Sequence, residues 1–283
     1  MLRRIALTAF VTLACGSLFA WGIFYMMGVL EKREAYDNHM TQAVVECPEI
    51  SGDVDVQLIQ ETDEELLRQI DFEVLQERNC DVAAWIFIPD TNVDPGFPVM
   101  QEPPDMEPGE YYYLWRDIDR VYDESSGGSI FMPYVPYVSD VPNQVQIMFG
   151  HRMKDRSLAF SNMKLFLEQD YLEEHRYVYV YYPDRVERYE AWAGCNADYM
   201  DVVYRIWPVY EKGSREYESL IEHIRDDLAK SLSGCQVTSE DELLILSTCY
   251  QDDVRMFLAC VLDRTYYYKG DFSLEGVSFD GLS

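Results

Sequence analysis

Basic side chains are scarce in this sequence. Its 283 residues contain 23 Lys and Arg against 51 Asp and Glu, which gives a formal net charge of −28 at pH 7. Nucleic acids and anionic lipid surfaces both reward clustered Lys and Arg. The charge balance therefore argues against nucleic-acid and anionic-lipid binding and indicates an acidic, self-repelling surface. Recruitment of a basic partner is the alternative interpretation.

Zinc-binding patterns are also lacking, because no C-x-x-C pair and no Cys/His spacing of the zinc-site kind occurs. No metal site is expected. The chain has no internal repeat and no low-complexity tract. Of its seven cysteines, Cys15 lies in an apolar segment and Cys249 is a candidate for chemistry. The disulfide pairing of the other five stays open: Cys47, Cys80, Cys195, Cys235 and Cys260.

One long run, residues 5–30, is uncharged and mostly apolar. At about 1.5 Å per residue it is long enough to cross a bilayer with some tilt. A cleaved signal peptide is the alternative, but its apolar region usually has about 7–15 residues, and no small-x-small site ends this run. We expect an uncleaved single-pass anchor within residues 1–30. The acidic excess after it favours a cytoplasmic N-terminus with the rest of the chain outside the cytoplasm.

The remaining chain is expected to form an acidic stalk (31–61), a catalytic domain (62–270) and a C-terminal tail (271–283). Hydrophobic periodicity predicts two helices in the domain. The first runs from a capping box at Thr62 and Glu65 to about Arg78. Its expected core face is Leu66, Ile70 and Val74. The second helix carries Leu220, Ile221, Ile224 and Leu228 and is expected to end at residues 233–234.

Short strands account for most of the domain. The predicted strands are residues 79–89, 111–114, 128–132, 144–149, 177–182, 188–194, 243–248 and 255–262. Residues 158–171 indicate short helical turns. Short β elements in this number usually close into a barrel or sandwich. We therefore expect a mainly β domain with a few peripheral helices.

Three candidate catalytic residues lie at the ends of predicted strands. Cys249 ends one strand, Arg255 begins the next, and His151 follows the strand at 144–149. A thiolate beside a cation and a base suits acyl transfer. A structural cysteine or an ordinary loop histidine is the simpler interpretation of each residue alone. The other candidates are weaker, because Arg264 lies too far along its strand and the remaining histidines are expected on the surface: His39, His175 and His223.

Motifs over about residues 60–265 resemble those of the class B sortases. They are N-x-D-V-x-x-W-I-x-I-P-x-T-N-V-D at 79–94, P-V-x-Q at 98–101, Y-L at 113–114, G-S-I-F at 128–131, F-G-H-x-M-K-D-x-S at 149–157, and L-S-T-C at 246–249 with Arg255. The chain departs from the family pattern at Pro133, where an acidic residue is usual, at an insertion of Pro95 and Gly96, and at Arg152 and Arg156 beside the histidine. These departures fall on substrate-side loops.

The resemblance implies a closed sortase-type β-barrel with peripheral helices and the activity of a membrane-anchored cysteine transpeptidase of a Gram-positive surface. Cys249 would attack the threonine carbonyl of a C-terminal sorting motif, with Arg255 stabilising the oxyanion. His151 would protonate the leaving amine. A peptidoglycan-precursor amine or a pilin lysine would then resolve the thioacyl-enzyme. No metal or organic cofactor is implied.

Several alternatives stay open at this point. Ser247 and Thr248 either shape the substrate groove or simply form a polar strand end. A surface protease would use the same Cys–His pair but release the acyl group to water. A non-catalytic sortase-like scaffold would bind surface proteins without chemistry. Wall anchoring and pilus polymerisation are not separable from the sequence, and neither is the sorting motif.

Overall fold

The computed structural model describes residues 44–45, 69–104, 111–122, 128–134, 143–152, 160–204, 209–251, 254–269 and 273–275. The chain divides into two compact units, Met1–Val44 and Val45–Ser283, and the first short strand, β1 (Val44–Val45), lies at their boundary. The account below concerns the second unit. Among the described residues, no helix has the length and hydropathy needed to cross a membrane. The expected anchor at residues 5–30 lies outside the described residues.

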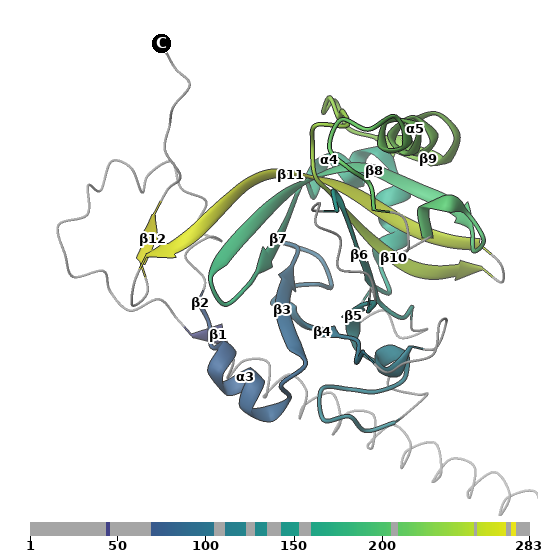
Figure 1. Ribbon diagram of the computed structural model, residues 1–283. Coiled ribbons are helices and arrows are strands. Elements are labelled where there is room, and N and C mark those ends of the chain that lie inside the picture. The colour runs from purple at the N-terminus through teal and green to yellow at the C-terminus, as the bar shows by residue number, and fades with distance from the viewer. Residues whose placement is uncertain are drawn as a thin grey trace, which may run out of the picture. The chain divides into compact units, whose positions relative to one another are not determined.

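A closed β-barrel forms the centre of this unit (Figure 1). Ten strands form one sheet in the order β12-β11-β10-β6-β5-β4-β3-β7-β8-β9, and a further pairing of β11 with β8 closes the ring. Closure removes the unpaired edges that an open sheet would expose. The mainly β, closed-barrel prediction is confirmed. The strands are β3 (Val82–Phe87), β4 (Phe97–Gln101), β5 (Ile130–Met132), β6 (Val145–Phe149), β7 (Tyr177–Tyr181), β8 (Arg185–Asp198), β9 (Ala229–Leu232), β10 (Leu243–Gln251), β11 (Val254–Lys269) and β12 (Ser273–Glu275).

Strands β8 and β11 are much longer than the others, at 14 and 16 residues. They run antiparallel to each other as curved ribbons on one side of the barrel (Figure 1). Register shifts between Ala259 and Cys260 and between Leu262 and Arg264 interrupt their ladder. Such bulges increase the local twist and bend of a strand. The two strands can therefore pair with each other and still take part in closing the barrel.

Short helices connect the strands. They are α3 (Phe72–Arg78), the 3-10 turns η2 (Tyr112–Leu114), η3 (Met163–Leu167) and η4 (Val202–Tyr204), the helices α4 (Gln169–Glu174) and α5 (Arg215–His223), and the π-helical turn η5 (Ile224–Leu228). Helical turns at η3 and α4 agree with the prediction for residues 158–171. The strand predicted at residues 111–114 is wrong, because η2 occupies these positions.

The first helix starts later than the periodicity predicts. Asp71 caps α3 by accepting a hydrogen bond from the backbone N–H of Val74 at 3.0 Å. The two residues before this cap form a short strand, β2 (Gln69–Ile70). Because the helix begins at Phe72, its buried residues are Phe72 and Leu75. Val74 is 49% exposed, so its assignment to the core face is wrong. The predicted cap and first turn, Thr62, Glu65 and Leu66, lie outside the described residues.

Loss of the Asp71 cap should weaken this part of the domain. We expect Asp71→Ala to lower the free energy of unfolding by about 1 kcal/mol, because one helix-start N–H loses its acceptor. Asp71→Ser should retain most of the stability. Urea denaturation checks this, with Glu73→Gln in the same exposed first turn as the matched control. A loss in the control equal to that of Asp71→Ala would contradict the role of the cap.

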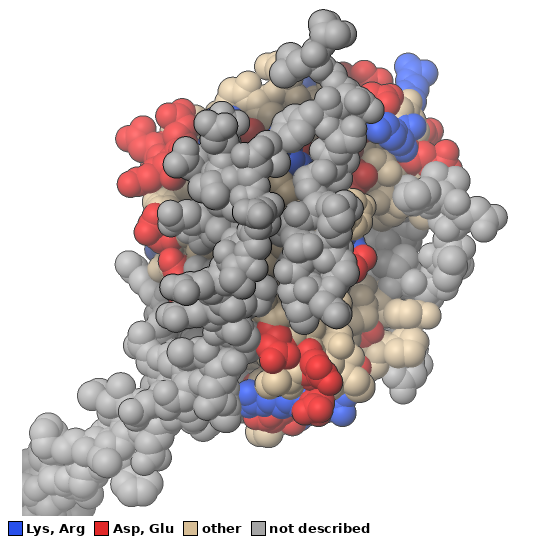
Figure 2. All heavy atoms as spheres, turned by 90° about the vertical axis from the view of Figure 1, so that its left-hand side faces the viewer, with Lys and Arg blue, Asp and Glu red and all other residues tan. Residues whose placement is uncertain are grey.

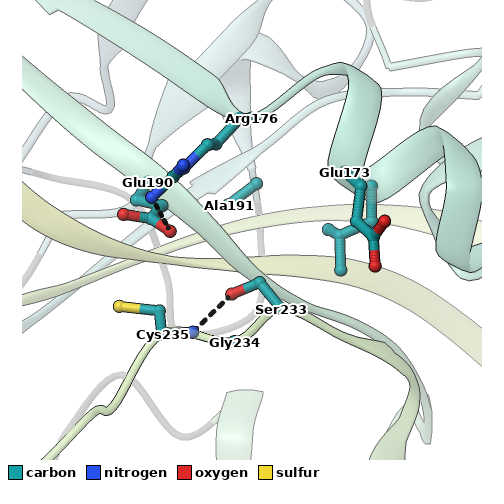
Figure 3. A pocket seen from close by; sticks show the side chains of 8 residues that line it. Glu173, Arg176, Glu190, Ala191, Ser233, Gly234 and Cys235 are labelled. Atoms are coloured by element: carbon teal, nitrogen blue, oxygen red, sulfur yellow. Dashed lines mark hydrogen bonds and ion pairs between the residues drawn. The ribbon is translucent and has the colours of Figure 1, made fainter.

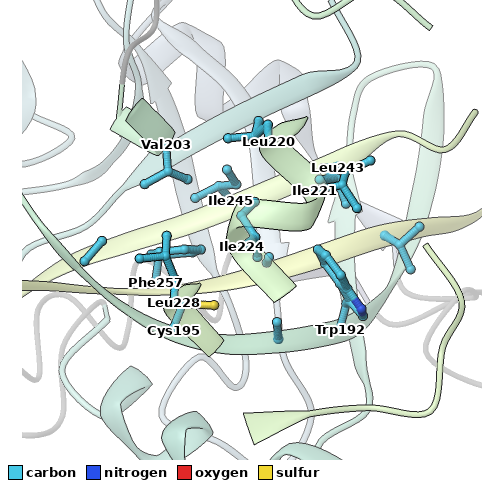
Figure 4. Close-up of a cluster of buried hydrophobic side chains, with 14 of the residues drawn as sticks. Trp192, Cys195, Val203, Leu220, Ile221, Ile224, Leu228, Leu243, Ile245 and Phe257 are labelled. Carbon is cyan, nitrogen blue, oxygen red and sulfur yellow. The ribbon is translucent and has the colours of Figure 1, made fainter. Parts of the chain in front are cut away.

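A hydrophobic cluster packs α5 and η5 against the barrel (Figure 4). Leu220 and Ile221 from α5 and Ile224 and Leu228 from η5 are buried, as the periodicity predicts. On the barrel side they meet buried residues of β8, β10 and β11, among them Trp192, Ile245 and Phe257. Each such side chain contributes roughly 1.5–3 kcal/mol on burial. The cluster therefore fixes strands β10 and β11, at whose facing ends Cys249 and Arg255 occur.

The second helix ends earlier than expected. The helical path stops at Leu228, and β9 (Ala229–Leu232) follows directly and pairs with β8. The predicted end at residues 233–234 is therefore wrong, because β9 occupies the residues that directly follow Leu228. Pairing to an available sheet edge here overrides the local sequence signal, as tertiary context often does.

Acidic side chains are spread over the surface seen in Figure 2, and the basic atoms visible there lie close to acidic ones. Two ion pairs follow the same pattern, with Arg78 bound to Asp119 at 2.6 Å and Arg185 to Glu187 at 2.7 Å. Such pairs occupy basic groups that could otherwise attract an anionic partner.

Candidate active site

The candidate site lies where β6 and β10 end and β11 begins. Strands β6 and β10 run parallel, with Phe149 paired to Ser247, and the N–H of Gly150 donates to the carbonyl of Ser247 at 3.0 Å. Two residues further along each strand lead to His151 and to Cys249. On the other side of β10, Cys249 is paired directly with Arg255 of β11. The strand register thus brings His151, which precedes Cys249 by 98 residues in the sequence, to a strand end adjacent to Cys249 and Arg255.

A glycine immediately before His151 is required by packing. A Cβ atom at Gly150 would lie 2.5 Å from Cδ2 of the Phe160 ring. Phe160 is fully buried and has little freedom to move away. Any larger residue here would displace the end of β6 and with it His151. The glycine of the F-G-H motif therefore has a structural reason in this chain.

His151 is half-buried beside an aromatic ring. Its imidazole packs against Trp115 with ring centroids 4.4 Å apart and planes at 54°. Burial lowers the pKa of His151, and the positive charge of Arg255 lowers it further. Both effects favour the neutral imidazole, which is the form that accepts a proton.

Arg255 also acts on two tyrosines around the site. Burial raises the pKa of Tyr111, and the charge of Arg255 lowers it. Burial likewise raises the pKa of Tyr204, while the charge of Arg255 lowers it. The guanidinium is therefore central to the electrostatics of this region.

Ser247 and Thr248 are fully buried within β10, at 0% and 2% exposure. The hydroxyl oxygens of Ser247 and Thr248 both lack a hydrogen-bond partner among the described residues. Both residues are therefore connected with the site only by their positions on β10, directly before Cys249.

Three aromatic residues of the site were missed from the sequence: Tyr111, Trp115 and Tyr204. Tyr111 packs on Phe131 at 5.4 Å and on Phe149 at 5.5 Å, which connects β5 and β6 below the candidate histidine. The dense aromatic run at 111–115 was the available signal, but a strand prediction hid its significance. Tyr204 had no local signal, since it reaches the site only through the fold.

Comparisons with known proteins give no match to any family model and none to any curated protein. Solved structures do match. The chain is similar to a Staphylococcus aureus sortase B–substrate complex, with 22% identity over 68% of this chain and 83% of that one and a TM-score of 0.57. It is also similar to Bacillus anthracis sortase B in complex with AAEK1, with 26% identity over 68% and 83% and a TM-score of 0.55. Clostridium perfringens sortase B matches at 20% identity over 69% of this chain and 100% of that one, with a TM-score of 0.58.

The chain has a class B sortase fold. This agrees with the resemblance found in the motifs, and the likeness covers all or most of each of these sortase B chains. In the sortase fold of this chain, β6, β10 and β11 are held in one sheet by the closed ring. Their ends are therefore fixed relative to one another, as a site that aligns several groups requires.

The sortase fold has a further pocket of about 490 Å³, and none of the candidate catalytic residues lines it (Figure 3). Arg176 and Glu190 form an ion pair across it at 3.0 Å. The backbone N–H of Cys235 donates to the hydroxyl of Ser233 at 3.3 Å. Because these groups are satisfied by one another, the pocket does not compete with the strand ends as the candidate active site.

Two further histidines have structural contacts in the sortase fold. His175 lies 3.2 Å from the carbonyl of Pro89 and packs on Tyr171. His223 lies between two carboxylates, with Nδ1 2.7 Å from Asp227 and Nε2 3.1 Å from Asp201. Asp201 directly precedes η4, so this contact ties α5 to the segment that carries Tyr204. The predicted solvated role of His223 needs correction, since its side chain is only 29% exposed.

The His223 contact predicts a pH-dependent stability. Burial lowers the pKa of His223, but hydrogen bonds and charges from Asp227 and Asp201 outweigh this and raise it above its ordinary value. Its contribution is therefore full below the unfolded pKa of about 6.5 and is lost as pH rises through the folded pKa. We expect His223→Gln to cost about 1 kcal/mol at pH 5 and little at pH 9.

Urea denaturation at the two pH values measures this difference. Glu222→Gln is the control, since Glu222 is an exposed residue of the same helix and precedes His223 directly. An equal loss for His223→Gln at both pH values would contradict the charged contact.

Proposed function

We propose that this chain is a cysteine transpeptidase of the cell surface that cleaves a C-terminal sorting motif and transfers the protein to a cell-wall amine. Residues 1–30 anchor it in the plasma membrane with the N-terminus inside, residues 31–61 form a stalk, and residues 62–270 catalyse the reaction outside the cytoplasm. Residues 271–283 form the tail. The donors are surface proteins with sorting signals. The reaction requires no metal or organic cofactor.

The strand register across β6, β10 and β11 supports this proposal most strongly. It is independent of sequence identity, since it follows from the pairs Phe149–Ser247 and Cys249–Arg255. Acyl transfer by a thiol needs a proton-transferring base and a donor for the oxyanion. Residues of the required types occupy the neighbouring strand ends. The solved Staphylococcus aureus sortase B in complex with a substrate has the same fold.

The first half of the proposed reaction forms a thioacyl-enzyme. Neutral His151, favoured by its lowered pKa, accepts the thiol proton while the sulfur of Cys249 attacks the threonine carbonyl. Arg255 donates to the oxyanion that develops. When the C–N bond breaks, the resulting imidazolium gives its proton to the leaving amine. A thioester and a free amine remain, and His151 is neutral again.

The second half transfers the acyl group. An incoming amine attacks the thioester carbonyl and loses a proton to His151. The C–S bond breaks, a new amide forms, and the thiolate of Cys249 takes the proton back from the imidazolium. A peptidoglycan-precursor amine as acceptor gives wall anchoring, and a pilin lysine gives subunit polymerisation. Water as acceptor would make the enzyme a protease.

Product analysis with a peptide pool tests the proposed function. The full chain, kept in detergent because residues 5–30 are apolar, is incubated with peptides of the Leu-Pro-x-Thr-Gly, Asn-Pro-x-Thr-Asn and Ser-Pro-x-Thr-Gly types. Each reaction is run with and without an amine acceptor, and with Cys249→Ala as the inactive control. We expect one motif to be joined to an amine, and joining to depend on Cys249. Cleavage at the same rate with and without the amine acceptor, and with no joined product, would indicate a protease instead of a transpeptidase. Binding without cleavage, unchanged in Cys249→Ala, would indicate a scaffold.

A further inference from the structure

The contacts described around His151 differ from those that usually orient a catalytic histidine. Catalytic histidines are commonly held by a hydrogen bond from one ring nitrogen to a carboxylate or carbonyl, which also fixes the tautomer. The Nδ1 atom of His151 is buried and has no hydrogen-bond partner among the residues that the structure describes. The ring contact described for this imidazole is with Trp115, at 4.4 Å between centroids.

The backbone before Trp115 is held firmly by a buried carboxylate. Trp115 directly follows η2, and Glu102, only 2% exposed, accepts hydrogen bonds from the backbone N–H groups of Tyr112 at 2.8 Å and Tyr113 at 2.9 Å. These are two of the unsatisfied N–H groups at the start of the turn. A charged acceptor makes such bonds about twice as strong as neutral ones.

The strand on the other side of η2 holds the same segment. The N–H of Ser129 donates to the carbonyl of Tyr113 at 3.0 Å, and its hydroxyl donates to the carbonyl of Arg116 at 2.9 Å. Gly128 has φ +64°, and a Cβ there would lie 2.2 Å from the carbonyl oxygen of Leu114. The backbone on both sides of Trp115 is therefore fixed, and with it the point from which the indole extends to His151.

We propose that Trp115 is the positioning residue of His151, holding the imidazole by ring packing at the strand ends where a hydrogen-bonded partner would otherwise be needed. This rests on the proposed function, because it assigns a role in the same site. An indole face restricts the tilt and rotation of the imidazole and excludes water from one side of it. It leaves both ring nitrogens available for proton transfer. A misplacement of about 1 Å at such a group can cost about 100-fold in rate.

The titration of His151 distinguishes this positioning role from a purely structural role of Trp115. Among the described residues, the groups that act on this ring are Trp115, which does not titrate, and Arg255 from β11. Removing the indole opens one face of the imidazole to water and leaves the charge of Arg255 in place. The pKa of His151 should then rise toward its ordinary value, because burial is the larger cause of its depression.

The test compares Trp115→Ala, Trp115→Phe and the parent in the full chain. Tyr267→Leu is the control, since Tyr267 is an exposed aromatic on β11 opposite β12. NMR of histidine labelled at Cε1 follows the four histidines, with the His151 signal assigned through His151→Gln. Steady-state rates with the motif peptide found in the product analysis give kcat and KM.

We expect Trp115→Ala to raise the pKa of His151 and to lower kcat by about 10-fold to 100-fold with KM changed less than about 2-fold. Trp115→Phe should restore most of both values, because it retains an aromatic face. The titration of His223 should stay unchanged and so report an intact fold. An unmoved His151 pKa in Trp115→Ala, an unchanged kcat, or an equal effect of Tyr267→Leu would overturn the proposal. If no peptide reacts with the parent chain, the proposed function fails while the His151 titration still decides whether Trp115 controls the ring.

Discussion

Replacing Cys249 by alanine is expected to lower the rate of sorting-motif cleavage on the order of 10⁴-fold or more, with the fold retained. The reason is that the thioacyl intermediate cannot form without a nucleophile, and the remaining site then has only binding and oxyanion stabilisation to contribute. The measurement is peptide turnover by the full chain, accompanied by a thermal unfolding curve for each variant. Because residues of one catalytic unit are not additive, His151→Ala in the Cys249→Ala background should cost little more.

Cys80 supplies a matched control for this prediction. It is an exposed free cysteine outside the strands that form the site. Cys80→Ala removes one thiol from the same chain and should leave turnover within about 2-fold of the parent, as expected for a surface substitution away from the reaction. Activity that survives in Cys249→Ala, or that is lost in Cys80→Ala, would remove Cys249 from the nucleophile role.

Replacing Arg255 by glutamine is expected to have the second largest effect, a fall in kcat of about 10²–10³-fold. The guanidinium is proposed to donate to the charge that develops on the attacked carbonyl, and loss of one such donor typically costs this much. A second effect follows from its charge. Arg255 lowers the pKa of both His151 and Tyr111, so both pKa values should rise when the cation is removed.

The double effect makes the Arg255 prediction specific. NMR titration reports the two pKa values, and peptide turnover reports the rate. Arg264→Gln is the control, since it removes an exposed arginine of the same strand far from Cys249 in the register. Arg255→Lys should keep part of the pKa effect, because the charge remains, but little of the rate, because the planar fork is lost. A fall in rate with both pKa values unmoved would mean that the residue is needed for the fold alone.

The strands were the most predictable part of this fold. Residues 144–149 alternate apolar and polar side chains, and residues 243–246 are a continuous apolar run, as expected for half-buried and fully buried strands. Both occur as strands, β6 and β10. The number of short strands predicted a barrel or a sandwich, and the resemblance to class B sortases implied the closed barrel. The pairing of β8 with β11 along almost their whole length depends on residues far apart in the sequence, and no local pattern specifies it.

The errors have local physical causes. The periodicity through Ile70 and Val74 suggested one long helix, but the Asp71 side chain accepts from the N–H of Val74 and starts the helix there. The aromatic run at 111–114 has high strand propensity, yet Glu102 binds two of its N–H groups and holds it as a 3-10 turn. In both cases one carboxylate competes with a pattern that is spread over many residues.

The site was predictable in its residue types but not in its surroundings. Cys249, His151 and Arg255 each stand at a strand end that the sequence indicates, and the register brings these positions together. Trp115 and Tyr204 reach the same region from separate turns. Their roles depend on how those turns pack against the barrel, which is tertiary information. The catalytic assignment itself stays a prediction until chemistry on Cys249 is measured.

Intact mass spectrometry of the full chain after brief exposure to the reactive sorting peptide, without an amine acceptor, tests the central claim most directly. We predict one added mass equal to the acyl part of the peptide. Digestion should map it to the fragment that contains Cys249 among the seven cysteines of the chain. Hydroxylamine or an amine acceptor should remove the added mass, as expected of a thioester. An adduct on another cysteine would contradict the account. Cleavage of the peptide with no acyl group ever detected on the protein would contradict it as well.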